Sequence, residues 1–224
     1  MPGSFDAVLL DLYDTVAWSE WPALRDLICG RLGIQPGELL RAFDRTRPDR
    51  SVGTYADAVG DMAAVLDALG LHDPAVAREL AETERSFLDD GVHVFDDALS
   101  TVLELRARGT RTALVSNCSH STRPTVDRLG LEDVFDTVIL SVEVGARKPQ
   151  PEIYRAALDG VGNPDPAATV FVDDQARYCD GARELGIDTR LIVRDTGPDP
   201  IEGSPADANG HVVIADLRTL LGRA

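Results

Sequence analysis

Ala7-Val8-Leu9-Leu10-Asp11-Leu12-Tyr13-Asp14-Thr15 is the stretch that decides the fold of this 224-residue chain. Its first four residues form a short apolar run, which is typical of a strand buried on both faces of a parallel sheet. The run delivers the carboxylate of Asp11 to its carboxyl end, where parallel α/β sheets bind their ligands. A carboxylate there can act as a nucleophile or a metal ligand. Taken alone, the same residues could equally cap a helix or a turn.

Three more segments place polar side chains at or just beyond expected strand ends. In chain order they are Ser116-Asn117, Lys148 and Asp173-Asp174. Each alone has an ordinary explanation as turn chemistry, as a solvated lysine or as a helix N-cap. The order of acid, hydroxyl, lysine and acid pair on successive strand ends indicates a single site.

Strands and helices alternate along most of the chain, which predicts an α/β fold with a doubly wound, Rossmann-like parallel sheet. The expected strands are 7–10, 112–116, 136–140, 169–172, 189–193 and 211–214. The expected core helices are 98–108, 124–129, 151–158, 175–185 and 215–221. Glycines that fall just past helix ends, as left-handed caps should, are Gly109, Gly130, Gly160 and Gly186. Residues 195–210 are rich in Pro, Gly, Asp and Ser and are expected to form a loop.

Residues 17–90 break this alternation, and we expect no strand in them. Helices are expected near 21–31, 36–43, 55–69 and 74–88. The predicted organisation is therefore an α/β core of residues 1–16 and 91–224 with an all-α block, residues 17–90, inserted after the first strand.

The composition narrows the function classes. A net charge of −16, with 38 acidic and 22 basic residues, repels nucleic acid and anionic membranes, so we expect neither as a partner. No secretory leader or membrane-spanning run is apparent, and three cysteines without metal-type spacing fit a reducing compartment. These features predict a cytoplasmic protein, and we expect it to be a monomer or a homodimer.

The motifs together resemble the haloacid dehalogenase superfamily of hydrolases. The matching stretches are 11–15, 114–117, 141–154 and 172–174 with Gly181-Ala182. The resemblance covers the chain outside roughly residues 17–90, and it implies that this block is a helical cap that closes over the strand ends and excludes water.

The resemblance implies that Asp11 is a nucleophile whose covalent intermediate is broken down by water. A phosphate dianion repels a carboxylate, so a cation must lie between them, and Mg²⁺ prefers hard oxygen ligands. The implied ligands are Asp11, Asp174, Asp173 and the main-chain carbonyl of Tyr13.

Further roles follow from the same resemblance. Lys148 neutralises charge on the nucleophile and the transferring group, and Ser116 with Asn117 binds the phosphoryl oxygens. Thr15 holds the turn and orients a carboxylate.

Two positions depart from the metal-dependent phosphatases of this family. Tyr13 stands where they usually carry the Asp that protonates the leaving group, and Tyr178 where they often carry Asp or Asn. An Asp-x-Tyr start resembles the metal-independent 2-haloacid dehalogenases, in which halide leaves without a proton. The acid pair Asp173-Asp174 instead resembles the phosphatases.

The leading hypothesis is a Mg²⁺-dependent phosphatase of a small phosphorylated metabolite, acting through an aspartyl-phosphate on Asp11, with Tyr13 as a candidate proton donor. The alternatives are a carbon-centred hydrolase, such as a dehalogenase or ring-opening enzyme, and a non-catalytic binding protein. Arg47, in a cluster with Arg41, Arg45 and Arg50, is the candidate cap contact to an anionic substrate, although a solvated helix end explains the same cluster.

Overall fold

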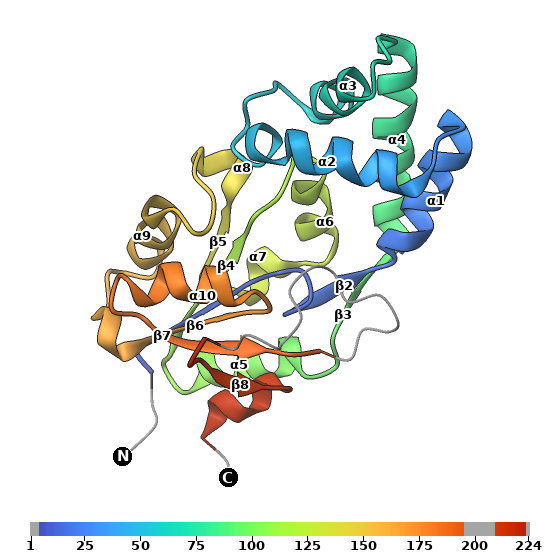
Figure 1. The fold of residues 1–224 in the computed structure, drawn as a ribbon. Helices are drawn as coiled ribbons and strands as arrows, with labels where there is room; N and C mark the ends of the chain where they lie inside the picture. Colours follow the sequence, from blue (N-terminus) through green and yellow to red (C-terminus); the bar gives the residue numbers. More distant parts are fainter. Residues whose placement is uncertain (1–4, 195–208, 223–224) are drawn as a thin grey trace.

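A six-stranded sheet forms the centre of the computed structural model, which describes residues 5–194 and 209–222 (Figure 1). Its strand order is β5-β4-β1-β6-β7-β8, and every neighbouring pair is parallel. The strands are β1 (Ala7–Leu10), β4 (Arg111–Ser116), β5 (Thr137–Leu140), β6 (Thr169–Asp173), β7 (Asp188–Ile192) and β8 (Val212–Ile214). With β1 central and the chain crossing to both sides of it, the expected doubly wound α/β fold is confirmed.

Side chains that alternate along β1 belong to two different cores, one on each face of the sheet. Val8 and Leu10 pack with the helices that cover one face, whereas Ala7 and Leu9 pack with the helices that cover the other. Burial on both faces explains why the strand reads as a continuous apolar run. The elements outside the sheet are α5 (Ala98–Ala107), α6 (Thr122–Arg128), α7 (Leu131–Val134), α8 (Ser141–Val144), α9 (Pro151–Gly160), α10 (Ala176–Arg183) and the 3-10 helices η1 (Pro166–Ala168) and η3 (Leu217–Leu221).

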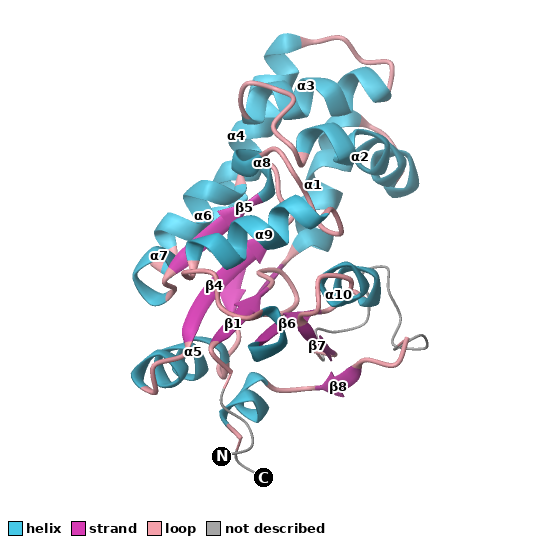
Figure 2. Cartoon of the chain, turned by 90° about the vertical axis from the view of Figure 1, so that its left-hand side faces the viewer, coloured by secondary structure: helices cyan, strands magenta, loops and turns pink. Residues whose placement is uncertain are grey.

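Four helices stand together at one end of the molecule and enclose a third apolar core of their own (Figures 1 and 2). They are α1 (Trp21–Leu32), α2 (Pro36–Arg50), α3 (Ala58–Ala68) and α4 (Pro74–Asp90), and we call them the α1–α4 unit. Helix α2 continues seven residues past its expected end and contains Pro48. The extension is stabilised by burial of Thr46 and Arg50 near its end.

A short antiparallel ribbon connects this unit to the sheet domain. It pairs β2 (Ala17–Ser19) with β3 (Val92–Val94). The expectation that residues 17–90 carry no strand is therefore wrong for Ala17–Ser19. Three-residue strands are too short to show a period, and these two form because both chain crossings run side by side.

The chain also departs from two smaller expectations. Gly109, Gly130 and Gly186 adopt positive φ as predicted, but Gly160 ends α9 and Gly162 takes the left-handed conformation instead. A Cβ added at Gly160 would lie 2.8 Å from the Thr137 side chain, so close packing on β5 requires this glycine. The helix expected at 215–221 is a 3-10 helix, Leu217–Leu221. Most of the loop expected at 195–210 lies outside the described residues.

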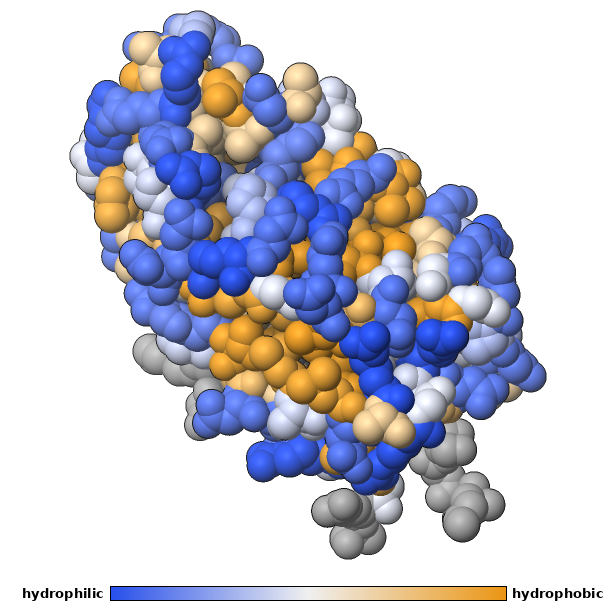
Figure 3. Space-filling view, turned by 180° about the vertical axis from the view of Figure 1, so that it is seen from behind, coloured by the Kyte–Doolittle hydropathy of each residue, from blue (hydrophilic) through white to orange (hydrophobic). Residues whose placement is uncertain are grey.

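The surface is largely hydrophilic over the α1–α4 unit, while apolar side chains gather lower on the rear face (Figure 3). Within residues 5–194 and 209–222, the exposed large apolar residues are Leu27, Leu40, Leu71, Leu103, Val144, Val212 and Val213. Among the described residues, no helix combines the length and apolar character that crossing a bilayer requires.

The packing of α10 generates a prediction. A Cβ added at Gly181 would lie 2.7 Å from Pro149 Cβ and 2.8 Å from its carbonyl oxygen, so we expect Gly181→Ala to lower the free energy of unfolding by about 1–3 kcal/mol. Gly30 is the matched control, because it lies within α1 with nothing within 4 Å of its added Cβ. Gly30→Ala should raise stability by up to about 1 kcal/mol. Urea unfolding midpoints measure both, and equal effects would contradict the packing argument.

Candidate active site

The predicted polar residues converge at the carboxyl ends of three adjacent strands. Leu10 pairs with Leu114 of β4 and with Val172 of β6, and the amide of Asp11 donates to the Val172 carbonyl at 3.0 Å. This register sets Asp11, after β1, between the ends of its two neighbours. Ser116 closes β4, and Asp173 closes β6.

Lys148 is the group that joins these strand ends. Its Nζ lies 2.5 Å from Asp11 Oδ1, 2.7 Å from Asp173 Oδ2 and 3.0 Å from the Val115 carbonyl oxygen. The side chain is only 1% exposed, so its charge is neutralised by these two carboxylates rather than by water. The lysine therefore holds Asp11 in one orientation and leaves its Oδ2 unbound by this contact.

Asn117 fixes the backbone of Lys148. Its Nδ2 donates to the Lys148 carbonyl at 2.9 Å, and its Oδ1 accepts the Lys148 amide at 2.7 Å. The sequence predicted a contact with substrate oxygens, whereas these two bonds direct the Asn117 amide toward the lysine loop.

Two hydroxyls near Asp11 have no hydrogen-bond partner among the described residues. Thr15 Oγ1 and Ser116 Oγ are both buried, and neither has a hydrogen-bond partner among the described residues. Buried polar atoms in folded proteins nearly always have one. Both hydroxyls are thus free to bind the oxygens of a ligand at Asp11.

Three carboxylates crowd the same space. Oxygens of Asp11, Asp173 and Asp174 all lie within 4.8 Å of one another. Asp173 is fully engaged, since its second oxygen accepts the Gln175 amide at 2.8 Å. Asp174 is partly buried and makes no hydrogen bond within the described ranges 5–194 and 209–222. Asp174 and the second oxygen of Asp11 are therefore the atoms best placed to hold a cation.

The electrostatics reflect this crowding. Burial, reinforced by the charge of Asp173, raises the pKa of Asp11 from 3.8 to about 7, against the opposing effect of Lys148. Burial and the negative charges of Asp173, Asp11 and Asp14 raise the pKa of Asp174 to about 9. Burial alone would lower the pKa of Lys148, but Asp11 and Asp173 raise it above its usual value. Lys148 therefore stays protonated, but its single positive charge does not balance the negative charges of the three carboxylates.

Tyr13 lies against this site as a neutral phenol. Burial raises its pKa well above the usual value, and a hydrogen bond with Thr122 only partly offsets this. The phenol can donate a hydrogen bond, but it is a poor base and a weak acid. The following residue, Asp14, adopts a left-handed conformation with φ 59° and turns the chain back toward β2.

The arginine cluster of α2 is arranged differently from the prediction. Arg47 pairs with Asp44 at 2.7 Å on the outer surface, with 46% of its side chain exposed. Arg50 is the buried member, and it donates to Thr46 Oγ1 at 3.0 Å and to the Phe43 carbonyl at 3.1 Å. The structure therefore does not bring Arg47 to the site.

Sequence reasoning missed a contact between the loop after β4 and helix α3. The amide nitrogen and Nδ1 of His120 lie 3.2 Å and 2.9 Å from Asp61 Oδ2. The other carboxylate oxygen, Asp61 Oδ1, is buried and has no hydrogen-bond partner among the described residues. The only signal was that His120 closely follows Ser116-Asn117 in the chain.

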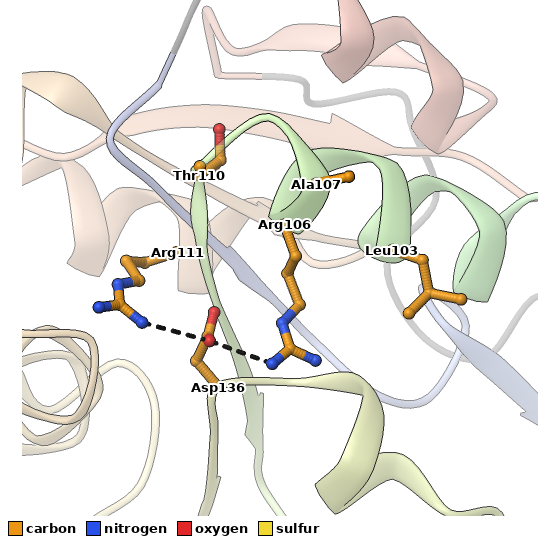
Figure 4. Close-up of a pocket in the computed structure, with 7 residues that line it drawn as sticks. Leu103, Arg106, Ala107, Thr110, Arg111 and Asp136 are labelled. Atoms are coloured by element: carbon orange, nitrogen blue, oxygen red, sulfur yellow. Dashed lines mark hydrogen bonds and ion pairs between the residues drawn. The ribbon is translucent and has the colours of Figure 1, made fainter.

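A pocket of about 570 Å³ lies at the opposite end of the strands, near the amino end of β4 (Figure 4). Arg106 and Arg111 both face Asp136 there, at 3.3 Å and 3.5 Å. Parallel sheets bind ligands at their carboxyl ends, so this pocket is not the active site. Its residues are Leu103, Arg106, Ala107, Gly109, Thr110, Arg111 and Asp136.

Comparison with known proteins gives a family match over most of the chain. A model described as haloacid dehalogenase-like hydrolase matches residues 5–186. The phosphoserine phosphatase of Thermus thermophilus is 32% identical over 149 residues, covering 65% of this chain and 56% of that protein. The chain spans about half the length of the curated relatives it matches.

Solved structures share the fold. A HAD family enzyme from Bacteroides thetaiotaomicron, in complex with magnesium and inorganic phosphate, has a TM-score of 0.68 and 24% identity, covering 86% of this chain and 96% of that one. The L-2-haloacid dehalogenase of Xanthobacter autotrophicus, with chloropropionic acid covalently bound, has a TM-score of 0.68 and 20% identity, covering 98% and 100%.

The raised carboxyl pKa values predict a pH dependence of stability. The folded protein binds more protons than the unfolded chain between about pH 4 and the folded values of about 7 for Asp11 and about 9 for Asp174. The contribution of these two carboxyl groups to the free energy of unfolding is fully present below pH 4, and it is lost as the pH rises through that window. Asp174→Asn should remove part of this loss, so the variant should gain stability over the wild type from pH 5 to pH 9 in metal-free buffer. A difference that shrinks with rising pH would contradict this electrostatic account.

Proposed function

The chain belongs to the haloacid dehalogenase-like hydrolases, and we propose that it is a Mg²⁺-dependent phosphatase of small phosphorylated metabolites. Asp174 carries this proposal, because it is a partly buried carboxylate without a hydrogen bond to the described residues, beside the nucleophile Asp11. Similarity to a phosphoserine phosphatase supports the reaction class. The magnesium and phosphate in the related Bacteroides enzyme support the cofactor.

The residues present fit a magnesium ion. Asp11, Asp174 and the main-chain carbonyl of Tyr13 offer the hard oxygen donors that Mg²⁺ prefers, and the raised pKa of Asp174 marks a deficit of positive charge there. Asp173 was also predicted as a metal ligand, but its two carboxylate oxygens instead accept hydrogen bonds from Lys148 Nζ and from the Gln175 amide. When bound, Mg²⁺ lowers the repulsion between a phosphate dianion and the Asp11 carboxylate.

The chain's own residues then perform the steps. Lys148 orients the Asp11 carboxylate through its contact with Oδ1, and this carboxylate attacks phosphorus while the bond to the leaving oxygen breaks. The unpartnered hydroxyls of Thr15 and Ser116 donate to the phosphoryl oxygens as their charge rearranges. Water hydrolyses the aspartyl-phosphate, which releases inorganic phosphate and restores the carboxylate.

Tyr13 narrows the substrate class. A phenol whose pKa lies above its usual value gives up its proton reluctantly, so leaving groups that depart without a proton are favoured. Acyl phosphates, enol phosphates and phosphoanhydrides meet this condition. The same residue also favours a second candidate function, 2-haloacid dehalogenation, because halide needs no proton and a dehalogenase shares the fold.

We propose further that residues 17–90 act as a cap on a catalytic core formed by residues 1–16 and 91–224. The separate apolar core of the α1–α4 unit supports this division. Cys29, Cys118 and Cys179 are buried and unpaired, which supports a cytoplasmic setting. A small anionic substrate and a monomeric or homodimeric state complete the proposal.

A turnover screen tests the reaction class. Phosphate esters, acyl phosphates and 2-haloacids are assayed with Mg²⁺ and with EDTA, and Asp11→Asn serves as the blank. We expect phosphate release from acyl phosphates that requires Mg²⁺ and disappears in the blank. Halide release that survives EDTA would refute the phosphatase proposal in favour of the dehalogenase, and turnover that persists in Asp11→Asn would refute the nucleophile.

Replacing Tyr13 tests the account of the leaving group. Tyr13→Asp restores a general acid, so kcat on alkyl phosphates should rise, by up to about 10²-fold. Acyl phosphates should gain far less, because their leaving group needs no proton. Tyr13→Phe is the control that removes the hydroxyl without adding an acid. An equal gain on both substrate classes would show that Tyr13 limits something other than protonation.

A further inference from the structure

One guanidinium contacts both segments that connect the cap to the core. Arg194 follows β7 and is 7% exposed. Its Nε and Nη2 donate to the Thr15 carbonyl at 3.2 Å and 2.6 Å, in the first connection, residues 15–20. Its Nη1 lies 2.9 Å from Asp97 Oδ2, at the end of the second connection, residues 91–97.

The second connection is held by two further contacts. The Arg194 guanidinium lies 4.2 Å from the centre of the Phe95 ring, and the Phe95 amide donates to the Val16 carbonyl at 3.0 Å. Asp97 in turn accepts the Leu217 amide at 2.6 Å, which fastens it to the core. The two connections are thus bonded to each other and to a single side chain.

The first connection leads directly to the nucleophile. The amides of Val16 and Ala17 both donate to the Leu12 carbonyl, at 2.9 Å and 2.8 Å, and Leu12 adjoins Asp11. A displacement of the Thr15 carbonyl therefore moves the turn that carries Asp11.

We propose that Arg194 is a positioning residue that sets the nucleophile turn and the cap connections in register with each other. This inference rests on the proposed function only for its kinetic consequence. A planar guanidinium reaches a carbonyl, a carboxylate and a ring face at once, whereas the single ammonium of lysine cannot satisfy all three. The chemistry of the three contacts thus requires arginine at this position.

Arg190, which lies within β7 shortly before Arg194 in the chain, provides a matched control. It pairs with Asp188 at 2.8 Å and lies 5.7 Å from the Phe5 ring, so it also combines an ion pair with a ring contact. It touches neither connection.

The experiment compares Arg194→Lys with Arg190→Lys by amide hydrogen exchange and by kinetics. Lysine keeps the charge opposite Asp97, so both variants should fold. Exchange of the Val16 and Ala17 amides should rise about tenfold in Arg194→Lys alone, while β4 stays protected. For the substrate identified in the screen, kcat should fall roughly 10- to 100-fold with KM nearly unchanged.

Three results would overturn the proposal: wild-type exchange at residues 15–17 in Arg194→Lys, exchange that rises equally throughout the sheet, or equal effects in Arg190→Lys. If Arg194→Lys does not fold, the double variant Arg194→Met with Asp97→Asn removes both buried charges and undergoes the same exchange test. If the wild type releases phosphate from none of the substrates, the proposed function is wrong. The exchange data then still decide whether Arg194 stabilises the turn after Asp11.

Discussion

The placement of one buried ammonium between two carboxylates is the constraint on which the site depends. Lys148 lies far from Asp11 and Asp173 in sequence, and its 2.5 Å and 2.7 Å contacts form only if β1, β4 and β6 end at the same level. Removing one member of such a buried set typically costs about 3–5 kcal/mol, because the remaining charges lose their compensation. The Asn117 clamp and the close approach of Gly181 to Pro149 keep the lysine loop in place.

The same constraint leaves the site electrostatically incomplete. Three carboxylates face one ammonium, so full ionisation leaves two negative charges unbalanced, the charge that one divalent cation carries. Without a cation, burial and this excess of negative charge favour the protonated carboxyl groups. The pKa values of Asp11 and Asp174 are raised for these reasons. The buried hydroxyls of Thr15 and Ser116, which have no hydrogen-bond partner among the described residues, can donate hydrogen bonds to a bound anion. Together they describe a site shaped for a cation and an anion, which is the basis of the phosphatase proposal.

Much of this arrangement could be predicted from the sequence, because buried parallel strands read as continuous apolar runs and polar residues after them must meet at one edge. The strands from β1 to β8 of the main sheet begin and end within one residue of their expected limits. What could not be predicted depends on contacts between distant segments. The β2–β3 ribbon, the packing of Gly160 on Thr137 and the burial of Arg50 instead of Arg47 are set by neighbours that no local pattern reveals. Arg194 was missed for the same reason, since its three partners lie in two other parts of the chain.

The contact between Asp61 and His120 bears on the cap that we propose for residues 17–90, because it bonds α3 to the loop after β4. Separating these residues would exchange protein hydrogen bonds for bonds to water, which changes the free energy little, and it would expose Asp61 Oδ1, a buried atom with no hydrogen-bond partner among the described residues. Separation at this contact would therefore allow hydrogen bonding to an oxygen that the contact itself leaves unpaired. If the cap opens and closes as proposed, a ligand that hydrogen-bonds Asp61 would favour the closed form more than one that only fills the proposed phosphoryl site.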